Sequence, residues 1–124
     1  MVLVVDGANV VGSVPDGWWR DRAGAAARLH VALRDAALPF DVVVLVLEGK
    51  ARAGVPEGES EGVTCVHAPG SGDDEILARC RYLTEAGDAV TVASADRGLL
   101  SRLAPLGVAT VGPRALRAQL ASEG

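Results

Sequence analysis

Carboxylate side chains follow the apolar segments of this sequence close to where each segment ends. Asp6 follows the run VLVV, Glu48 follows VVVLVL, and Asp96 comes shortly after AVTVA. Asp73 and Asp74 open a further polar stretch, GSGDDEI. A group of carboxylates can hold divalent cations, and such ions activate water for attack on phosphate esters. The residue types therefore suggest metal-assisted hydrolysis.

Bringing these acids together opposes folding unless a cation lies among them. Two unpaired carboxylates about 5 Å apart repel each other by roughly 3 kcal/mol at an effective dielectric constant near 20. Because stability alone gives no reason for such a cluster, we expect a positive ion within it. Oxygen ligands without a suitable His or Cys favour a hard ion, so the expected cofactor is Mg²⁺ or Mn²⁺, as one ion or two.

Each acid also fits a purely structural role. The stretch from Ser71 to Asp74 matches a capping pattern, and acids in the first turn of a helix favour the helix dipole. Asp6 before Gly7 fits a turn, and Asp96 fits the cap of a short helix. For Asp74 the structural and the functional interpretation have equal weight.

Basic residues stand beside the acids in the sequence. Arg97 follows Asp96, and Lys50 and Arg52 follow Glu48, which is consistent with a phosphate-bearing substrate. The formal net charge of −4 argues against bulk electrostatic attraction to nucleic acid, but it leaves room for a local basic groove. Hydrolysis of a phosphodiester is the reaction class that these residues indicate.

The chain alternates between apolar strands and helical segments. The apolar runs are continuous and rich in Val, which is typical of strands buried on both faces of a parallel sheet; they cover residues 2–5, 42–47, 63–66, 89–93 and 107–111. Helical segments are predicted at residues 18–37, 73–86, 97–104 and 113–121. Residues 48–62 are predicted to form a loop. This alternation predicts a three-layer α/β fold.

Parallel strands bring their carboxyl ends to one edge of the sheet. With a strand order of 3-2-1-4-5, the strands that end near Asp6, Glu48 and Asp96 are neighbours, about 4.8 Å apart. Right-handed crossovers then bring Asp73 over the same edge. The acids are therefore expected to meet.

The length and composition indicate one globular domain, spanning residues 1–124. Hydrophobic residues make up 49% and charged residues 23% of the chain, which excludes disordered and membrane classes. The first apolar run has no basic lead and reaches Asp6 almost at once, so we expect neither a signal peptide nor a membrane contact, and a cytoplasmic location. Cys65 and Cys80 lack metal-site spacing and are predicted to be buried thiols.

The motifs together resemble a known family. LVVDGANVVGS is similar to the opening motif of the NYN domains, in their YacP-like bacterial branch, which belong to the PIN-like nuclease superfamily. VLVLEGKAR resembles the second motif, GSGDDEI the third, and ASADRGL the Ser/Thr-x-Asp-Arg motif. The resemblance implies a three-layer α/β/α Rossmann-like (PIN-like) domain with a central parallel sheet of about five strands, order 3-2-1-4-5. It also implies a Mg²⁺- or Mn²⁺-dependent ribonuclease acting on RNA.

The resemblance also assigns roles by position. Asp6, Asp73 and Asp96 would be catalytic and hold the metal directly or through water. Asn9 would orient Asp6 or a substrate phosphate, Ser94 would hydrogen-bond the acids, and Arg97 would pair with an acid or a phosphate. The predicted metal ligands are Asp6, Glu48, Asp73, Asp74 and Asp96; the predicted substrate-binding residues are Asn9, Ser94, Arg97, Lys50 and Arg52.

Two departures from the family pattern leave other functions open. Glu48 stands where the family usually has Asp, and its extra methylene moves the carboxylate by roughly 1 Å. The chain also lacks added basic segments, so either a partner supplies the grip on RNA or the substrate is small. The alternatives are a nucleotide pyrophosphohydrolase or phosphatase, although Ala8 removes a DxD motif, and an inactive PIN-like RNA-binding or assembly module, for example a homodimer.

Aromatic and basic residues outside these motifs are predicted to have structural roles. Trp18 and Trp19 are expected to pack on the sheet rather than stack on bases. His67 is expected to lie in a surface or loop position. Arg114 and Arg117 are predicted to form a solvated helix face.

Overall fold

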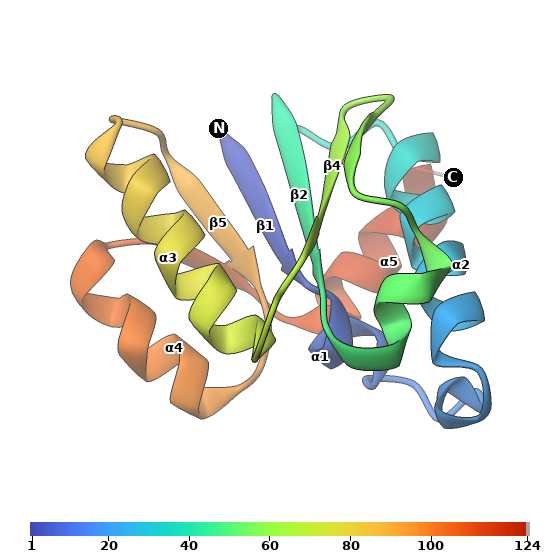
Figure 1. Cartoon of the computed structure of the whole chain (residues 1–124). Coiled ribbons are helices and arrows are strands. Elements are labelled where there is room, and N and C mark those ends of the chain that lie inside the picture. Colours follow the sequence, from blue (N-terminus) through green and yellow to red (C-terminus); the bar gives the residue numbers. More distant parts are fainter. Residues whose placement is uncertain (124) are drawn as a thin grey trace.

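A six-stranded sheet lies between two layers of helices in the computed structural model, which describes residues 1–123. Helices α3 and α4 cover one face, whereas α1, α2 and α5 cover the other (Figure 1). The three-layer α/β/α architecture is therefore confirmed. Within residues 1–123, no helix is both long and apolar enough to cross a membrane.

Five parallel strands form most of the sheet. They are β1 (Val2–Asp6), β2 (Val42–Leu47), β4 (Val63–His67), β5 (Val90–Ala93) and β6 (Ala109–Val111). The spatial order is β3-β4-β2-β1-β5-β6, so the parallel strands follow the expected order 3-2-1-4-5. The short strand β3 (Gly58–Ser60) extends this order at one edge, where it pairs antiparallel with β4.

The prediction of a loop over residues 48–62 is wrong in part. This segment contains the 3₁₀ helix η2 (Gly49–Gly54) and β3, which forms a hairpin with β4. Ser60 pairs with Val63, so the hairpin turns on only Glu61 and Gly62, at φ values of 50° and 85°. Two residues with positive φ match the right-handed twist of the strands in a hairpin. The sequence does not predict this turn, because Asn-Gly and Asp-Gly are its usual signals and the chain has Glu61-Gly62 here.

All four predicted helical segments contain helices. They are α2 (Arg22–Asp35), preceded by the 3₁₀ helix η1 (Trp18–Arg20), then α3 (Gly72–Glu85), α4 (Arg97–Leu103), followed by η3 (Ala104–Leu106), and α5 (Pro113–Glu123). Helix α1 (Gly7–Val11) was not predicted. It has five residues, too few to show a helical period in the sequence.

The side chains of the central strands alternate between two hydrophobic cores. Leu3 and Val5 of β1 face the core beneath α1, α2 and α5, whereas Val2 and Val4 face the core beneath α3 and α4. The same alternation runs along β2. Burial on both faces explains why these strands appear in the sequence as continuous apolar runs.

Close contact between α1 and β2 fixes the position of the first helix. A Cβ atom on Gly7 would lie 2.6 Å from the carbonyl oxygen of Val46 and 2.8 Å from Cδ2 of Leu47. Only glycine fits at this distance without displacing the backbone of β2. Gly7 therefore lets α1 begin directly after Asp6, at the carboxyl edge of the sheet.

We expect Gly7→Ala to lower the free energy of unfolding by about 2 kcal/mol, because the added methyl group overlaps the backbone of β2. Chemical denaturation at neutral pH measures this change. Gly70→Ala is the matched control, since a Cβ atom there meets no atom within 4 Å. Equal stability of the two variants would contradict the close contact.

Candidate active site

Asp6 is a buried carboxylate at the end of β1, with a relative exposure of 4%. Its Oδ2 accepts a hydrogen bond of 2.8 Å from the hydroxyl of Ser94, and its Oδ1 accepts one of 3.4 Å from the backbone N–H of Asn9. Asp6 is also the N-cap of α1. Both oxygens therefore have partners, as burial of a charge requires.

Ser94 connects two of the predicted catalytic residues. Its hydroxyl donates to Asp6 and accepts a hydrogen bond of 3.1 Å from the backbone N–H of Asp96. Asp96 in turn caps α4, because its Oδ1 accepts a hydrogen bond of 3.0 Å from the N–H of Leu99. The capping interpretation of Asp96 is thus confirmed, and it leaves the second carboxylate oxygen for other partners.

Asn9 holds the loop after β5 in place. Its side-chain Oδ1 accepts a hydrogen bond of 2.8 Å from the backbone N–H of Ala95, between Ser94 and Asp96. The contact of Asn9 with Asp6 is made by its backbone N–H and not by its side chain. Asn9 therefore positions the segment that carries Asp96.

Glu48 and Asp73 meet at the start of α3. Asp73 lies in the first turn of this helix and is half-buried. Glu48 reaches the same place from the end of β2, since a Cβ atom on Gly72 would lie 2.8 Å from its Oε1. The absence of a side chain at Gly72 makes room for Glu48 beside Asp73.

The charges of these acids act on one another. The pKa of Asp6 is raised, first by burial and then by the charges of Asp73 and Glu48, while the hydrogen bonds from Ser94 and Asn9 oppose the shift. The pKa of Asp73 is also raised, first by burial and then by Asp96 and Glu48; Arg102 partly offsets this effect. Asp73 is therefore within electrostatic range of acids from three other segments.

Asp74 differs from its neighbour Asp73. Its Oδ1 accepts a hydrogen bond of 2.9 Å from Arg102, and its side chain is 72% exposed. The hydrogen bond from Arg102 is the main reason that the pKa of Asp74 is lowered. Ser71 caps the helix through the backbone N–H of Asp74, as the sequence pattern predicts. The predicted metal role of Asp74 remains a prediction.

The carboxylate oxygens of these acids are ligands that suit a hard divalent ion, but they do not converge on one point. Among residues 1–123, no three His, Cys, Asp or Glu side chains are arranged so that they could share an ion. Asp6 directs both oxygens to hydrogen-bond donors, and Asp96 directs one. Metal binding by three of these acids would therefore require some of their side chains to move.

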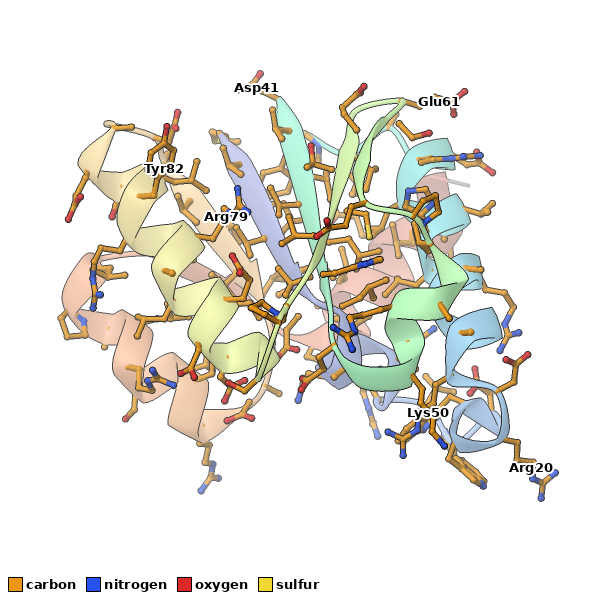
Figure 2. All side chains as sticks on the ribbon, in the orientation of Figure 1. Arg20, Asp41, Lys50, Glu61, Arg79 and Tyr82 are labelled. Carbon is orange, nitrogen blue, oxygen red and sulfur yellow. The ribbon has the colours of Figure 1, made fainter. Side chains whose placement is uncertain are left out.

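The predicted substrate-binding cations have different surroundings. Arg97 and Lys50 are exposed, and Figure 2 shows Lys50 directed away from the sheet at the same end of the molecule as Arg20. Arg52 instead donates to the carbonyl oxygens of Gly49 and Ala68, at 3.1 and 3.4 Å. Arg52 therefore ties η2 to the segment before α3, while its contact with substrate stays a prediction.

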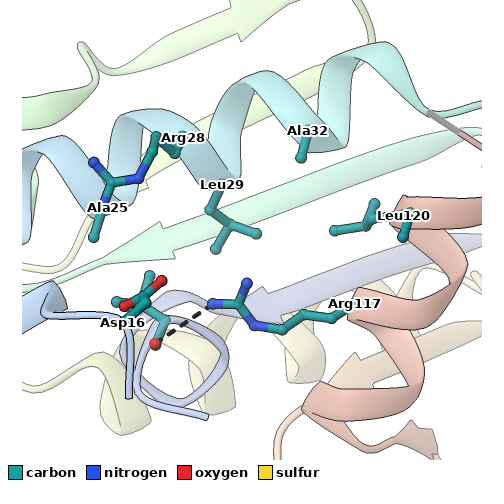
Figure 3. A pocket seen from close by; sticks show the side chains of 9 residues that line it. Asp16, Ala25, Arg28, Leu29, Ala32, Arg117 and Leu120 are labelled. Carbon is teal, nitrogen blue, oxygen red and sulfur yellow. Dashed lines mark hydrogen bonds between the residues drawn. The ribbon is translucent and has the colours of Figure 1, made fainter. Parts of the chain in front are cut away.

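Arg117 has a structural role that the sequence did not reveal. The prediction of a solvated face is wrong for Arg117, because its Nε and Nη2 donate to the carbonyl oxygen of Val10, at 3.1 and 3.0 Å. Nη2 also reaches the carbonyl oxygen of Val11 (Figure 3). These carbonyl groups end α1, so Arg117 caps a helix that was itself not predicted. Arg114 is exposed, as expected.

The predicted packing against the core is confirmed for Trp18 but not for Trp19, and the prediction for His67 is wrong, because His67 is the last residue of β4 and is half-buried. Trp18 is half-buried against the core, whereas Trp19 is 49% exposed and packs edge-on against Trp18 at 5.8 Å. The Nε2 atom of His67 lies 2.7 Å from the carbonyl oxygen of Val55, which directs the ring toward the segment after η2.

Comparison with solved structures supports the fold. The chain is similar to Rae1 (YacP) from Bacillus subtilis, with a TM-score of 0.79 and 17% identity over 98% of this chain and 74% of that one. A mutant form of that protein gives a TM-score of 0.76 and 18% identity over 98% and 75%. No protein-family model matches the chain, and no curated protein matches its sequence. At these identities the likeness is one of fold alone.

We expect the free energy of unfolding of Asp6→Asn to increase relative to that of the parent protein as pH rises. The pKa of Asp6 in the folded protein lies above its ordinary value of 3.8, mainly because the carboxyl group is buried. Above pH 3.8 the unfolded chain therefore releases a proton that the folded protein still holds. The free energy of unfolding falls as pH rises through this range, until the carboxyl group of the folded protein ionises as well. The asparagine variant has no carboxyl group to ionise at this position, so it does not incur this loss.

Denaturation of both proteins in the absence of metal, from pH 4 to pH 8, measures this difference. Asp88→Asn, at an exposed acid, is the control for the loss of one carboxyl group. A difference for Asp6→Asn that stays constant or shrinks with pH would contradict the burial penalty.

We expect Arg117→Gln to lower the free energy of unfolding by about 2 kcal/mol, because it removes charged hydrogen bonds to the end of α1. Arg114→Gln, on the same helix, should stay within about 0.5 kcal/mol of the parent. Thermal and chemical denaturation measure both changes. Equal effects of the two substitutions would show that the Arg117 contacts contribute little.

Proposed function

We propose that the protein is a metal-dependent ribonuclease that hydrolyses phosphodiester bonds of RNA with Mg²⁺ or Mn²⁺. The observation that carries this proposal is the gathering of acids at the carboxyl edge of the sheet, where Ser94 links Asp6 to the backbone of Asp96. The charges of Glu48 and Asp73 act on Asp6, and those of Glu48 and Asp96 act on Asp73. Burial is the main cause of the raised pKa values of Asp6 and Asp73, and a cation among these acids would offset the additional contribution from their mutual repulsion.

Asp6, Asp73 and Asp96 would hold the ion, with Glu48 as a further ligand. When bound, a divalent ion supplies a water nucleophile and charge stabilisation at the phosphate. Ser94 contributes by fixing the carboxylate of Asp6 and the backbone of Asp96 with one hydroxyl. Asn9 contributes by fixing the backbone between Ser94 and Asp96.

RNA is the proposed substrate for two reasons. The ordered motifs resemble those of a ribonuclease family, and the fold is shared with a protein whose name is that of the same branch. The exposed side chains of Lys50 and Arg97 lie on elements that begin at the acidic edge, where they can approach phosphates.

The proposed partner is an accessory RNA-binding protein or a second copy of the chain, since the net charge of −4 provides little general attraction for RNA.

We expect the protein to cleave labelled RNA with Mn²⁺ or Mg²⁺ and to lose this activity with a chelator. Asp73→Asn should reduce cleavage by more than about 100-fold, because even groups that only orient metal ligands contribute about 10- to 100-fold. Gel analysis of single-stranded and structured RNAs measures the rates. Glu75→Gln, in the same turn of α3, is the control and should remain active.

A second readout does not depend on cleavage. Mn²⁺ should raise the melting temperature of the parent and of Glu75→Gln more than that of Asp73→Asn. Cleavage that survives both the chelator and Asp73→Asn would contradict the proposal. Hydrolysis of nucleoside triphosphates without RNA cleavage would favour a phosphohydrolase, and the absence of both activities and of Mn²⁺ binding would favour an inactive module.

A further inference from the structure

A pocket of about 330 Å³ opens beside the acidic edge, between the start of α1, the entry to α2 and the end of β2. Its walls include Ala8, Trp18, Arg22, Leu47, Glu48 and Ala51. Glu48 therefore belongs both to the group of interacting acids and to the pocket wall. Gly7, which directly follows Asp6, also lines the pocket. The pocket is thus continuous with the candidate active site.

The aromatic wall of this pocket suits a flat ring. The guanidinium group of Arg22 lies over the indole ring of Trp18, 5.3 Å from its centroid, and both groups line the pocket. Trp19 packs edge-on against Trp18 at an interplanar angle of 88°, which restricts the orientation of the ring. Indole rings and guanidinium planes are both surfaces on which nucleobases stack.

Charges of both signs line the pocket, because Arg22 supplies a guanidinium group and Glu48 a carboxyl group. Glu48 supplies a carboxylate, which accepts hydrogen bonds but donates none when ionised. A neutral base with N–H groups on its edge suits the acceptor at Glu48, whereas Glu48 would repel a phosphate or a carboxylate placed against it. The exposed Arg22 can instead meet the phosphate that a nucleotide carries outside the pocket.

We propose that this pocket holds the unpaired base of a nucleotide adjoining the phosphate to be cleaved, a proposal that rests on the ribonuclease function above. A base seated between Trp18 and Glu48 brings its own phosphate to the edge where Asp6 and Glu48 lie. A paired base cannot enter, because it would have to leave its helix. The pocket therefore selects single-stranded RNA over duplex RNA.

Tryptophan fluorescence tests the pocket without requiring cleavage. The chain has two tryptophans, so Trp18 is the only one in Trp19→Phe, and Trp19 is the only one in Trp18→Phe. Tetranucleotides of each base are titrated into both proteins in the presence of a chelator. We expect saturable quenching in Trp19→Phe, and affinity weakened by about 10-fold or more in Trp18→Phe, because stacking on the indole ring is lost.

A second variant fills the pocket and leaves the aromatic residues in place. Ala8 is exposed at the pocket wall, so Ala8→Leu should narrow the pocket while preserving the melting temperature. Introduced into Trp19→Phe, it should weaken tetranucleotide binding by about 10-fold or more, as loss of a stacked base does. Ala118→Leu, at an exposed position of α5, is the matched control and should bind as Trp19→Phe does.

The outcomes separate this proposal from the ribonuclease function. Absence of saturable quenching in Trp19→Phe, or equal affinity in Ala8→Leu and Ala118→Leu, would overturn the base pocket even if RNA is cleaved. Saturable binding that Ala8→Leu weakens, together with preference for single-stranded RNA, supports it. Saturable tetranucleotide binding of this kind without any RNA cleavage would support the base pocket and overturn the ribonuclease function.

Discussion

A single buried hydroxyl group joins the ends of two neighbouring strands. Ser94 donates to the carboxylate of Asp6 and accepts from the backbone of Asp96, so the end of β1 and the start of α4 are fixed to each other. A carboxylate as buried as Asp6 needs such donors, because leaving it unpaired away from water would strongly oppose folding. The arrangement of α1, α4 and the acids between them depends on this contact.

Structural and chemical roles coincide at this edge of the sheet. Asp6 caps α1, Asp96 caps α4, and Asp73 lies in the first turn of α3. The free N–H groups and the dipole at a helix N-terminus favour negative charge, so the helices offset part of the repulsion between the acids. A capping role therefore does not exclude a functional one, because the same helix ends help to stabilise these carboxylates in the absence of a cation.

The sequence predicts the sheet better than it predicts the contacts around it. Continuous apolar strands buried on both faces give a clear signal, and with the strand order they bring Asp6, Glu48, Asp73 and Asp96 to one edge. Short elements escape such prediction: α1 has five residues and β3 has three. Pairings between distant residues escape it too. Arg102 binds Asp74 from 28 residues away, and Arg117 binds Val10 from 107 residues away, which no local pattern reveals.

The short hairpin of β3 and β4 has a consequence for behaviour at high concentration. Strands with unpaired backbone groups at a sheet edge are templates for intermolecular pairing, and long apolar edges are the most hazardous. In the part of the chain that the structure describes, the outermost strands β3 and β6 have three residues each, and β3 carries Glu59. The long, valine-rich strands all lie inside the sheet, with both of their edges occupied. We therefore expect the hairpin to limit fibril-like self-assembly of the folded chain. It lies on the opposite side of β2 from β1 and β5.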